Sequence, residues 1–249
     1  LISLLMFLHL GYMNWFSPLV LFFLTSISAL KMKSISPLYT PKTPNQLLYS
    51  ESLDNTEKTM TVALGPAGSG KTLLACVNAI SCLKRGDIRK IVLTRPLVSV
   101  EEEEIGFLPG NLVTKMDPWT KPMFDIFKEF YSVGDLNNMV KLGIIEVAPL
   151  AFMRGRTLNN SFIILDEAQN TTPEQMKMFL TRIGFGSKVV VTGDATQVDV
   201  PDGRSGLSGL QRLLGDIEGL EFVHLDTSDV VRHRIVGDIV AAYEKDTQA

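Results

Sequence analysis

The hydrophobic pattern between residues 60 and 225 alternates between two periods. Short apolar runs rich in β-branched residues predict buried strands, and the segments between several of them place apolar residues at helical spacing. The expected strands are residues 60–64, 90–94, 144–148, 162–166, 188–192 and 220–225. The expected helices lie near residues 70–84, 118–131, 173–182, 206–217 and 235–244. Because strands that alternate with helices pair in parallel, the pattern predicts an α/β fold with one helix-covered parallel sheet.

The first fifty residues form a different kind of sequence. They contain no Asp or Glu, and residues 1–30 contain no Lys or Arg either. The continuously apolar run at residues 19–24 is typical of a membrane or of the protein-export machinery. Gly11, Asn14 and Pro18 interrupt the stretch, which favours a short signal-type segment over a long spanning helix. The alternatives are a retained membrane anchor and an incorrectly assigned N-terminus.

Residues 29–43 read ALKMKSISPLYTPKT and have the basic, Ser-, Thr- and Pro-containing composition of an organelle transit peptide. A signal segment followed by a transit segment resembles the bipartite leaders of nucleus-encoded plastid proteins in algae with secondary plastids. We therefore expect a targeting leader over residues 1–40, outside the fold, and one catalytic domain over residues 41–249. The expected location is an organelle, with a plastid as the first candidate. A membrane-anchored or cytoplasmic protein is the alternative.

Composition supports one folded domain and narrows the functions. The 249 residues are 45% hydrophobic and 20% charged, which is enough for a substantial core. With 24 Lys and Arg against 27 Asp and Glu, the formal net charge is −3, which excludes nucleic-acid binding by bulk positive charge. The two cysteines, Cys76 and Cys82, are too few for a disulfide framework or a structural zinc site. We expect them to be packing residues.

A glycine-rich segment, GPAGSGKT, joins the first expected strand to the first expected helix. Its glycines let the backbone curl so that successive N–H groups point at phosphate oxygens, and the helix start adds its positive end. Lys71 is expected to reach the β- and γ-phosphates, and the Thr72 hydroxyl to hold Mg²⁺. A glycine-rich turn without a ligand is the alternative, which the strand–loop–helix context disfavours. The expected phosphate-binding residues are Gly65, Pro66, Ala67, Gly68, Ser69, Gly70, Lys71 and Thr72.

Two later strands end in polar residues. The apolar run at residues 161–165 is followed by Asp166 and Glu167, and parallel strands present such carboxyl ends to a ligand crevice. Asp166 fits the residue that orients Mg²⁺, and Glu167 fits the base that positions the attacking water. Gln197 follows the next strand and could bond both a γ-phosphate oxygen and the water, which makes it a candidate sensor. Ordinary surface carboxylates and a loop glutamine are the alternatives.

Six segments in unbroken order resemble the PhoH-like family, phosphate-starvation-inducible-type P-loop ATPases related to superfamily 1 helicases. They are GPAGSGKT, LTRP at 93–96, FMRGRTL at 152–158, FIILDEAQN at 162–170, GDATQVDVPDGRSGL at 193–207 and DVVRHRIV at 229–236. The resemblance covers residues 41 to 245. It implies a P-loop NTPase fold with a RecA- or helicase-like parallel sheet, a single motor domain, and Mg²⁺-dependent ATP hydrolysis.

The resemblance also implies roles for residues outside these strand ends. The segment around Gln46 and Tyr49 is similar to the helicase-type adenine motif, in which an amide reads the adenine edge and an aromatic ring stacks on the base. Arg232 resembles the arginine that completes the phosphate site of such motors. Arg234 stands where the family usually has proline, so the resemblance does not imply the conformation of the turn at this position. A surface pair of Arg232 with a neighbouring aspartate is the alternative.

The expected partners follow from the same resemblance. A single motor core implies a homo-oligomer, with a hexameric ring as the first candidate and Arg232 supplied to a neighbouring site. Arg95, Arg154, Arg156 and the 232–234 cluster are candidates for contact with RNA or single-stranded nucleic acid. The alternative is an ATP-binding regulatory or assembly protein with slow turnover. A small-molecule kinase is disfavoured because Glu167 beside Asp166 suits water rather than an acceptor hydroxyl. Membrane contact is expected only if the N-terminal hydrophobic segment is retained.

Overall fold

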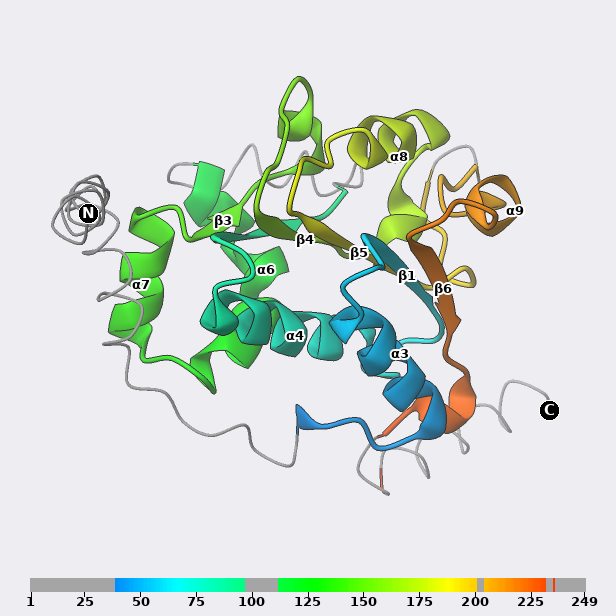
Figure 1. Ribbon diagram of the computed structural model, residues 1–249, viewed down its shortest axis with the longest axis horizontal. Helices are drawn as coiled ribbons and strands as arrows, with labels where there is room; N and C mark the ends of the chain where they lie inside the picture. The colour runs from blue at the N-terminus through cyan, green and yellow to red at the C-terminus, as the bar shows by residue number, and fades with distance from the viewer. Residues whose placement is uncertain (1–38, 97–111, 201–203, 232–234, 236–249) are drawn as a thin grey trace, which may run out of the picture.

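Six parallel strands form one sheet in the centre of the molecule (Figure 1). The computed structural model describes residues 39–96, 112–200, 204–231 and 235. The strand order is β3-β2-β4-β5-β1-β6, so β1 and β4, which precede the glycine-rich segment and the acidic pair, lie on either side of β5. The strands are β1 (Met60–Leu64), β2 (Lys90–Thr94), β3 (Ile145–Val147), β4 (Ser161–Leu165), β5 (Lys188–Gly193) and β6 (Leu220–His224).

Helices cover both faces of the sheet (Figure 1). On one face lie α3 (Pro44–Asp54), α4 (Lys71–Arg85), α6 (Leu112–Lys128) and α7 (Val133–Lys141). On the other lie α8 (Pro173–Leu180), α9 (Leu210–Leu214) and the 3₁₀ turn η2 (Leu150–Met153). Two further 3₁₀ turns, η3 (Ala168–Asn170) and η4 (Thr227–Asp229), follow β4 and β6. The result is a three-layer α/β arrangement.

The core consists of two clusters separated by the sheet, because successive strand residues point to opposite faces. In β4, Phe162 and Ile164 lie in the cluster under α4 and α6, whereas Ile163 and Leu165 lie in the cluster under α8. All four side chains are at most 1% exposed. Burial on both faces explains why these strands are continuous apolar runs rather than alternating ones.

Local signals fix the ends of several helices. Thr172 caps α8 by accepting a hydrogen bond from the Gln175 N–H, and the Gln175 side chain accepts one from the Thr172 N–H. Pro173 occupies the first turn, where its missing N–H has no cost. At the other end of α4, Gly86 adopts a left-handed conformation (φ 79°) and closes the helix.

The structure confirms the expected α/β class and all six strands, with differences of at most one residue at any end. The helices agree less well. The segment expected as one helix over 118–131 is α6, which begins earlier, and α7 follows it unpredicted. The helix expected over 206–217 is only the five residues of α9. Helix α3 was not predicted, because Gln46 and Ser52 are among its buried residues whereas Leu47 and Leu48 are exposed.

The expected leader, apart from its last two residues, and the expected helix over 235–244, apart from Ile235, lie outside the described residues. Within the described ranges, no helix combines the length and the apolar character needed to cross a membrane. Cys76 and Cys82 are both buried and unbonded to each other on α4, which agrees with a packing role.

Substitution of Phe127 should measure the contribution of the packing between α4 and α6. Its ring has no exposed surface, so Phe127→Ala leaves a cavity and should lower the free energy of unfolding by about 3–5 kcal/mol. Phe185, which is 91% exposed, provides the matched control, and Phe185→Ala should change the value by less than about 0.5 kcal/mol. Urea titration followed by circular dichroism measures both. Equal effects of the two substitutions would contradict this packing.

Candidate functional site

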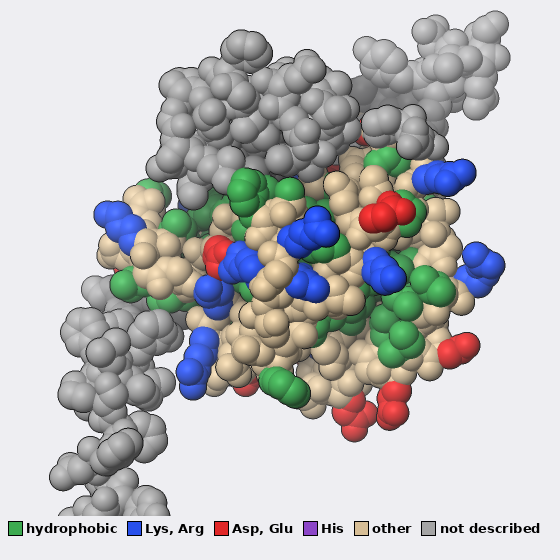
Figure 2. All heavy atoms as spheres, turned by 90° about the horizontal axis from the view of Figure 1, so that it is seen from above, with side chains coloured by type: hydrophobic (Ala, Val, Ile, Leu, Met, Phe, Trp, Pro, Cys, Tyr) green, Lys and Arg blue, Asp and Glu red, His purple; other side chains and the backbone are tan. Residues whose placement is uncertain are grey.

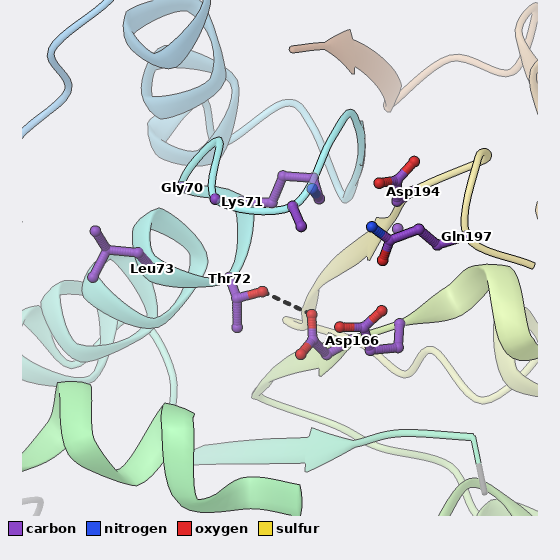
Figure 3. Close-up of a pocket in the computed structure, with 11 residues that line it drawn as sticks. Gly70, Lys71, Thr72, Leu73, Asp166, Asp194 and Gln197 are labelled. Carbon is purple, nitrogen blue, oxygen red and sulfur yellow. Dashed lines mark hydrogen bonds between the residues drawn. The ribbon is translucent and has the colours of Figure 1, made fainter. Parts of the chain in front are cut away.

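The carboxyl ends of β1, β4 and β5 surround a cavity of about 360 Å³ (Figure 3). One wall is the glycine-rich loop and the start of α4, and the opposite wall is made by the residues that follow β4 and β5. In an open parallel sheet this edge is where ligands bind. The lining residues are Ala67, Gly68, Gly70, Lys71, Thr72, Leu73, Asp166, Glu167, Gly193, Asp194 and Gln197.

The glycine-rich loop has a curled backbone that only glycine allows at its critical points. Gly68 and Gly70 have φ values of 84° and 89°, in the left-handed region. Gly65 lies against the chain after β6, where a Cβ would stand 2.5 Å from the Leu225 carbonyl oxygen. Ser69 is fully buried and donates its hydroxyl hydrogen to the Pro66 carbonyl, 2.8 Å away. The loop is therefore held open by its own bonds at the N-terminus of α4.

Lys71 holds its ammonium group inside this loop. Nζ donates to the carbonyl oxygens of Gly65 at 2.6 Å and Pro66 at 2.8 Å. Burial lowers the pKa of Lys71, while the nearby carboxylates of Asp194 and Glu167, and of Asp166 more weakly, act in the opposite direction. A buried cation is thus placed between the loop and the acidic wall of the cavity.

Thr72 and Asp166 face each other across the cavity (Figure 3). The Thr72 hydroxyl donates to Asp166 Oδ1 at 2.7 Å, and the Thr192 hydroxyl on β5 donates to the same oxygen at 2.6 Å. A hydroxyl and a carboxylate are oxygen ligands of the kind that Mg²⁺ accepts. Mg²⁺ in nucleotide sites takes one or two such groups and completes its shell with phosphate and water oxygens. The residues present therefore fit the expected ion.

Glu167 has an unusual backbone and two side-chain partners. Its φ of 53° is in the left-handed region, which non-glycine residues seldom adopt and which clusters at functional sites. Its Oε1 lies 3.3 Å from Nη2 of Arg95, and its Oε2 accepts a hydrogen bond of 2.6 Å from Nε2 of Gln169. The other end of the Gln169 amide accepts the N–H of Asp194 at 3.0 Å. Gln169 thus joins Glu167 to the segment after β5.

Asp194 and Gln197 lie on the wall opposite the loop (Figure 3). Asp194 Oδ1 accepts hydrogen bonds from the backbone N–H and the hydroxyl of Thr196. Its Oδ2 is buried and accepts no hydrogen bond from the described part of the chain. A buried charged oxygen without a donor is costly unless a ligand satisfies it. Asp194, Gln169 and Arg95 were not assigned to this site from the sequence, although all three lie within motifs identified there.

The structure places Gln46 and Tyr49 beside the loop. Gln46 is 5% exposed; its Nε2 donates to the carbonyls of Ser69 and Asp229, both at 3.0 Å, and its Oε1 accepts the Lys42 N–H. Only its Oε1 has remaining hydrogen-bonding capacity, so its role toward adenine stays a prediction.

The structure contradicts the expectation that the adenine base stacks on Tyr49. Its ring has no exposed surface, so a base cannot stack on it in this conformation. Its hydroxyl donates to the Lys71 carbonyl at 3.2 Å, and burial raises its pKa well above the usual value. Tyr49 therefore anchors α3 to the first turn of α4 rather than lining the site.

The arginines expected near phosphates differ in their surroundings. Arg232, with the rest of the 232–234 cluster, lies outside the described residues. Arg154 is exposed after η2. Arg156 pairs with Glu146, Nη1 to Oε1 at 2.5 Å, and Lys90 pairs with the other oxygen of that carboxylate at 2.9 Å. Arg95 contacts Glu167 as described above. Among the described arginines of this set, Arg154 is exposed, whereas Arg95 and Arg156 are partly buried.

A six-stranded parallel sheet, a glycine-rich loop leading into a helix, and an acidic pair at the end of the second strand from that loop define a P-loop NTPase fold. Within that class the chain belongs to the PhoH family: the family model described as PhoH-like protein matches residues 39–244. The family resemblance and the expected fold are both confirmed.

Curated relatives agree with this assignment. The PhoH-like protein of Bacillus subtilis (strain 168) is 49% identical over 205 residues, which is 82% of this chain and 63% of that protein. The PhoH-like protein of Mycobacterium tuberculosis (strain H37Rv) is 52% identical over 82% of this chain and 58% of its own length. Protein PhoH of Escherichia coli (strain K12) is 38% identical over 80% of this chain and 56% of its own. The chain thus spans about three fifths of these relatives.

Solved structures are more distant. The Hef helicase domain of Pyrococcus furiosus matches with a TM-score of 0.44 and 15% identity over 78% of this chain and 40% of that one. The UvsW helicase of bacteriophage T4 matches with a TM-score of 0.42 and 14% identity over 87% of this chain and 74% of that one. Because these similarities are low, the fold assignment rests on the strand order and the glycine-rich loop of this chain.

The carboxylate between Lys90 and Arg156 predicts a pH-dependent share of stability. The hydrogen bond from Arg156, reinforced by Lys90, lowers the pKa of Glu146. A lowered folded-state pKa contributes stability above the unfolded-state pKa of about 4.3, and this is lost as the pH falls through the folded value. Glu146→Gln should therefore be less stable than the native protein at pH 7, by a margin that shrinks below about pH 4. Urea titrations across this range measure the margin; a constant margin would contradict the assignment.

Proposed function

We propose that the chain is an Mg²⁺-dependent ATP hydrolase whose turnover is coupled to RNA or another single-stranded nucleic acid. The observation that carries the proposal is the shared cavity: Lys71 lies on one wall, and Asp166 and Glu167 lie on the other. A phosphate-binding loop alone would serve any nucleotide-binding protein. A second carboxylate beside the metal-type aspartate is what hydrolysis requires in addition.

Different residues of the site would bind the phosphates of ATP and the Mg²⁺ that accompanies them. Backbone N–H groups at the start of α4 and the Lys71 ammonium group favour the phosphate charges, since Lys71 can exchange its bonds to the Gly65 and Pro66 carbonyls for bonds to phosphate oxygens. Thr72 and Asp166 would hold Mg²⁺, and the bound ion would neutralise phosphate charge. Asp194 Oδ2 offers a further acceptor on that side.

Glu167 would act on the attacking water. The oxygen of water bonds to the γ-phosphorus, the bond from that phosphorus to the bridging oxygen breaks, and ADP leaves with the electron pair. The proton released by the water is accepted by the Glu167 carboxylate and passes to solvent. Gln197 lies at the cavity wall beyond Asp194 and would orient the water from its amide. Arg232 would stabilise transition-state charge, in its own site or that of a neighbouring subunit in a ring, with the hexamer as the first candidate.

Nucleic-acid coupling is supported by the family membership and by exposed Arg154. The alternative is an ATP-binding assembly protein with slow turnover. The two differ in one measurement, the rate of ATP hydrolysis by the purified full chain with and without added single-stranded RNA. Stimulation supports the coupled hydrolase, whereas tight ATP binding with a slow rate that RNA does not change supports the alternative.

Lys71→Ala should weaken ATP binding. Loss of one hydrogen bond between charged groups predicts an affinity lower by roughly ten- to a hundredfold. Isothermal titration with Mg²⁺ and ATP measures this, and Lys177→Ala, at an exposed lysine of α8, is the matched control. Unchanged affinity in Lys71→Ala would remove the loop from the binding site.

Glu167→Gln should separate binding from hydrolysis. The amide keeps the size of the carboxylate but has one acceptor oxygen in place of two and accepts no proton, so turnover should fall by about 100- to 10,000-fold while ATP still binds. Phosphate release measures the rate, and Glu174→Gln on the surface of α8 should turn over ATP as the native protein does. Equal turnover in Glu167→Gln and the native protein would reject the base assignment.

A further inference from the structure

The ion pair between Arg95 and Glu167 lies on the outer side of the catalytic strand end. Arg95 follows β2, and the sheet order places β2 and β5 on opposite sides of β4. Glu167 follows β4, so the guanidinium group approaches it from the side away from the glycine-rich loop. Glu167 lines the cavity, whereas Arg95 is not among the described residues that line it. The contact therefore directs one oxygen of the carboxylate, Oε1, toward the end of β2.

Both oxygens of Glu167 are engaged in this arrangement. Nη2 of Arg95 lies 3.3 Å from Oε1, and Nε2 of Gln169 donates to Oε2 at 2.6 Å. To accept a proton from a water on the loop side, the carboxylate must turn away from Arg95 or share that contact. The side chains of Arg95 and Glu167 are 23% and 35% exposed, and ion pairs of such exposure exchange readily because they contribute little net stability.

Arg95 is also connected through its backbone to the 3₁₀ turn η2. The Leu150 N–H, in the first turn of η2, donates to the Arg95 carbonyl at 3.4 Å. The neighbouring Thr94 carbonyl accepts the Asp166 N–H at 3.0 Å. Leu150 and Met153 are buried against α8 and hold η2 in place. The end of β2 thus joins the catalytic strand end to η2.

The outer surface of η2 has the chemistry of a single-stranded nucleic-acid contact. Phe152 is 60% exposed, and the exposed Arg154 follows two residues later. Figure 2 looks onto the side of the molecule that carries α8 and shows Lys and Arg side chains interspersed with hydrophobic ones. An exposed aromatic ring stacks on any base, and a nearby arginine binds the phosphate that follows it.

We propose that Arg95 restrains Glu167 until a phosphate of single-stranded nucleic acid, bound over Phe152 and Arg154, takes the guanidinium group. The inference rests on the proposed ATP hydrolysis and adds its regulation. A phosphodiester offers arginine a charge-assisted, two-pronged contact, so it competes well with a partly exposed carboxylate. Once Arg95 turns to the phosphate, Glu167 turns to the water. Arg95 is in this sense a positioning residue, because it acts through Glu167.

The test compares Arg95→Met with the native full chain in steady-state ATP turnover with and without oligouridylate. The native protein should be stimulated. In Arg95→Met the unstimulated rate should rise roughly two- to fivefold, the range that one partly exposed ion pair spans, and the stimulation ratio should fall toward one. Arg89→Ala removes an exposed arginine that immediately precedes the opposite end of β2 and should behave as the native protein does.

Three further variants test the route. Arg95→Lys keeps the charge but loses the two-pronged geometry, so it should retain the low unstimulated rate and respond weakly to oligouridylate. Phe152→Ala and Arg154→Ala should raise the oligouridylate concentration needed for half-maximal stimulation, whereas Phe185→Ala, at an exposed ring on another loop, should not.

Several outcomes would overturn the inference. A lower unstimulated rate in Arg95→Met would mean that Arg95 holds Glu167 in its productive orientation. An unchanged stimulation ratio in Arg95→Met, or an unchanged oligouridylate requirement in both Phe152→Ala and Arg154→Ala, would remove the proposed route. A native protein that hydrolyses ATP without responding to oligouridylate would overturn the regulation and leave the hydrolase standing. A native protein without turnover under any condition would overturn both.

Discussion

One carboxylate oxygen joins the elements that form the cavity. Asp166 Oδ1 accepts hydrogen bonds from Thr72 at the start of α4 and from Thr192 on β5, while Asp166 itself directly follows β4. A buried carboxylate is costly unless donors satisfy it, so the three elements are held in register by the need to satisfy this charge. The positions of Lys71 on one wall and Glu167 on the other both depend on that register.

The strands were predictable from the sequence because both faces of the sheet are covered, which makes each strand a continuous apolar run. Helix α3 was not, because its pattern is inverted: Gln46 is buried for its hydrogen bonds, whereas Leu47 and Leu48 are exposed. Periodicity identifies a helix by the apolar stripe it buries. It does not recognise a helix whose buried residues are two polar ones, Gln46 and Ser52, together with Tyr49 and Leu53.

The residues of the candidate site were also predictable only in part. The spacing within the glycine-rich segment constrains the backbone directly, so Lys71 and Thr72 could be placed from residue types alone. Tyr49 could not be placed, since whether an aromatic ring stacks on a base or fills the core depends on which helix covers it. Arg95 and Gln169 were missed for a related reason. Arg95 meets Glu167 across a contact that the strand order creates, whereas the contact of Gln169, two residues from Glu167, depends on the conformation of the turn after β4.

Gln46 donates hydrogen bonds to the carbonyl oxygens of Ser69 and Asp229, and so connects parts of the chain that are synthesised far apart in time. Asp229 also accepts hydrogen bonds from the side chains of Thr43 and Asn45, so the start of α3 and the turn η4 are bonded to each other. During translation, the loop that precedes α4 leaves the ribosome long before Asp229 does. The nascent protein therefore acquires the full support of that loop only when nearly all of the domain has emerged.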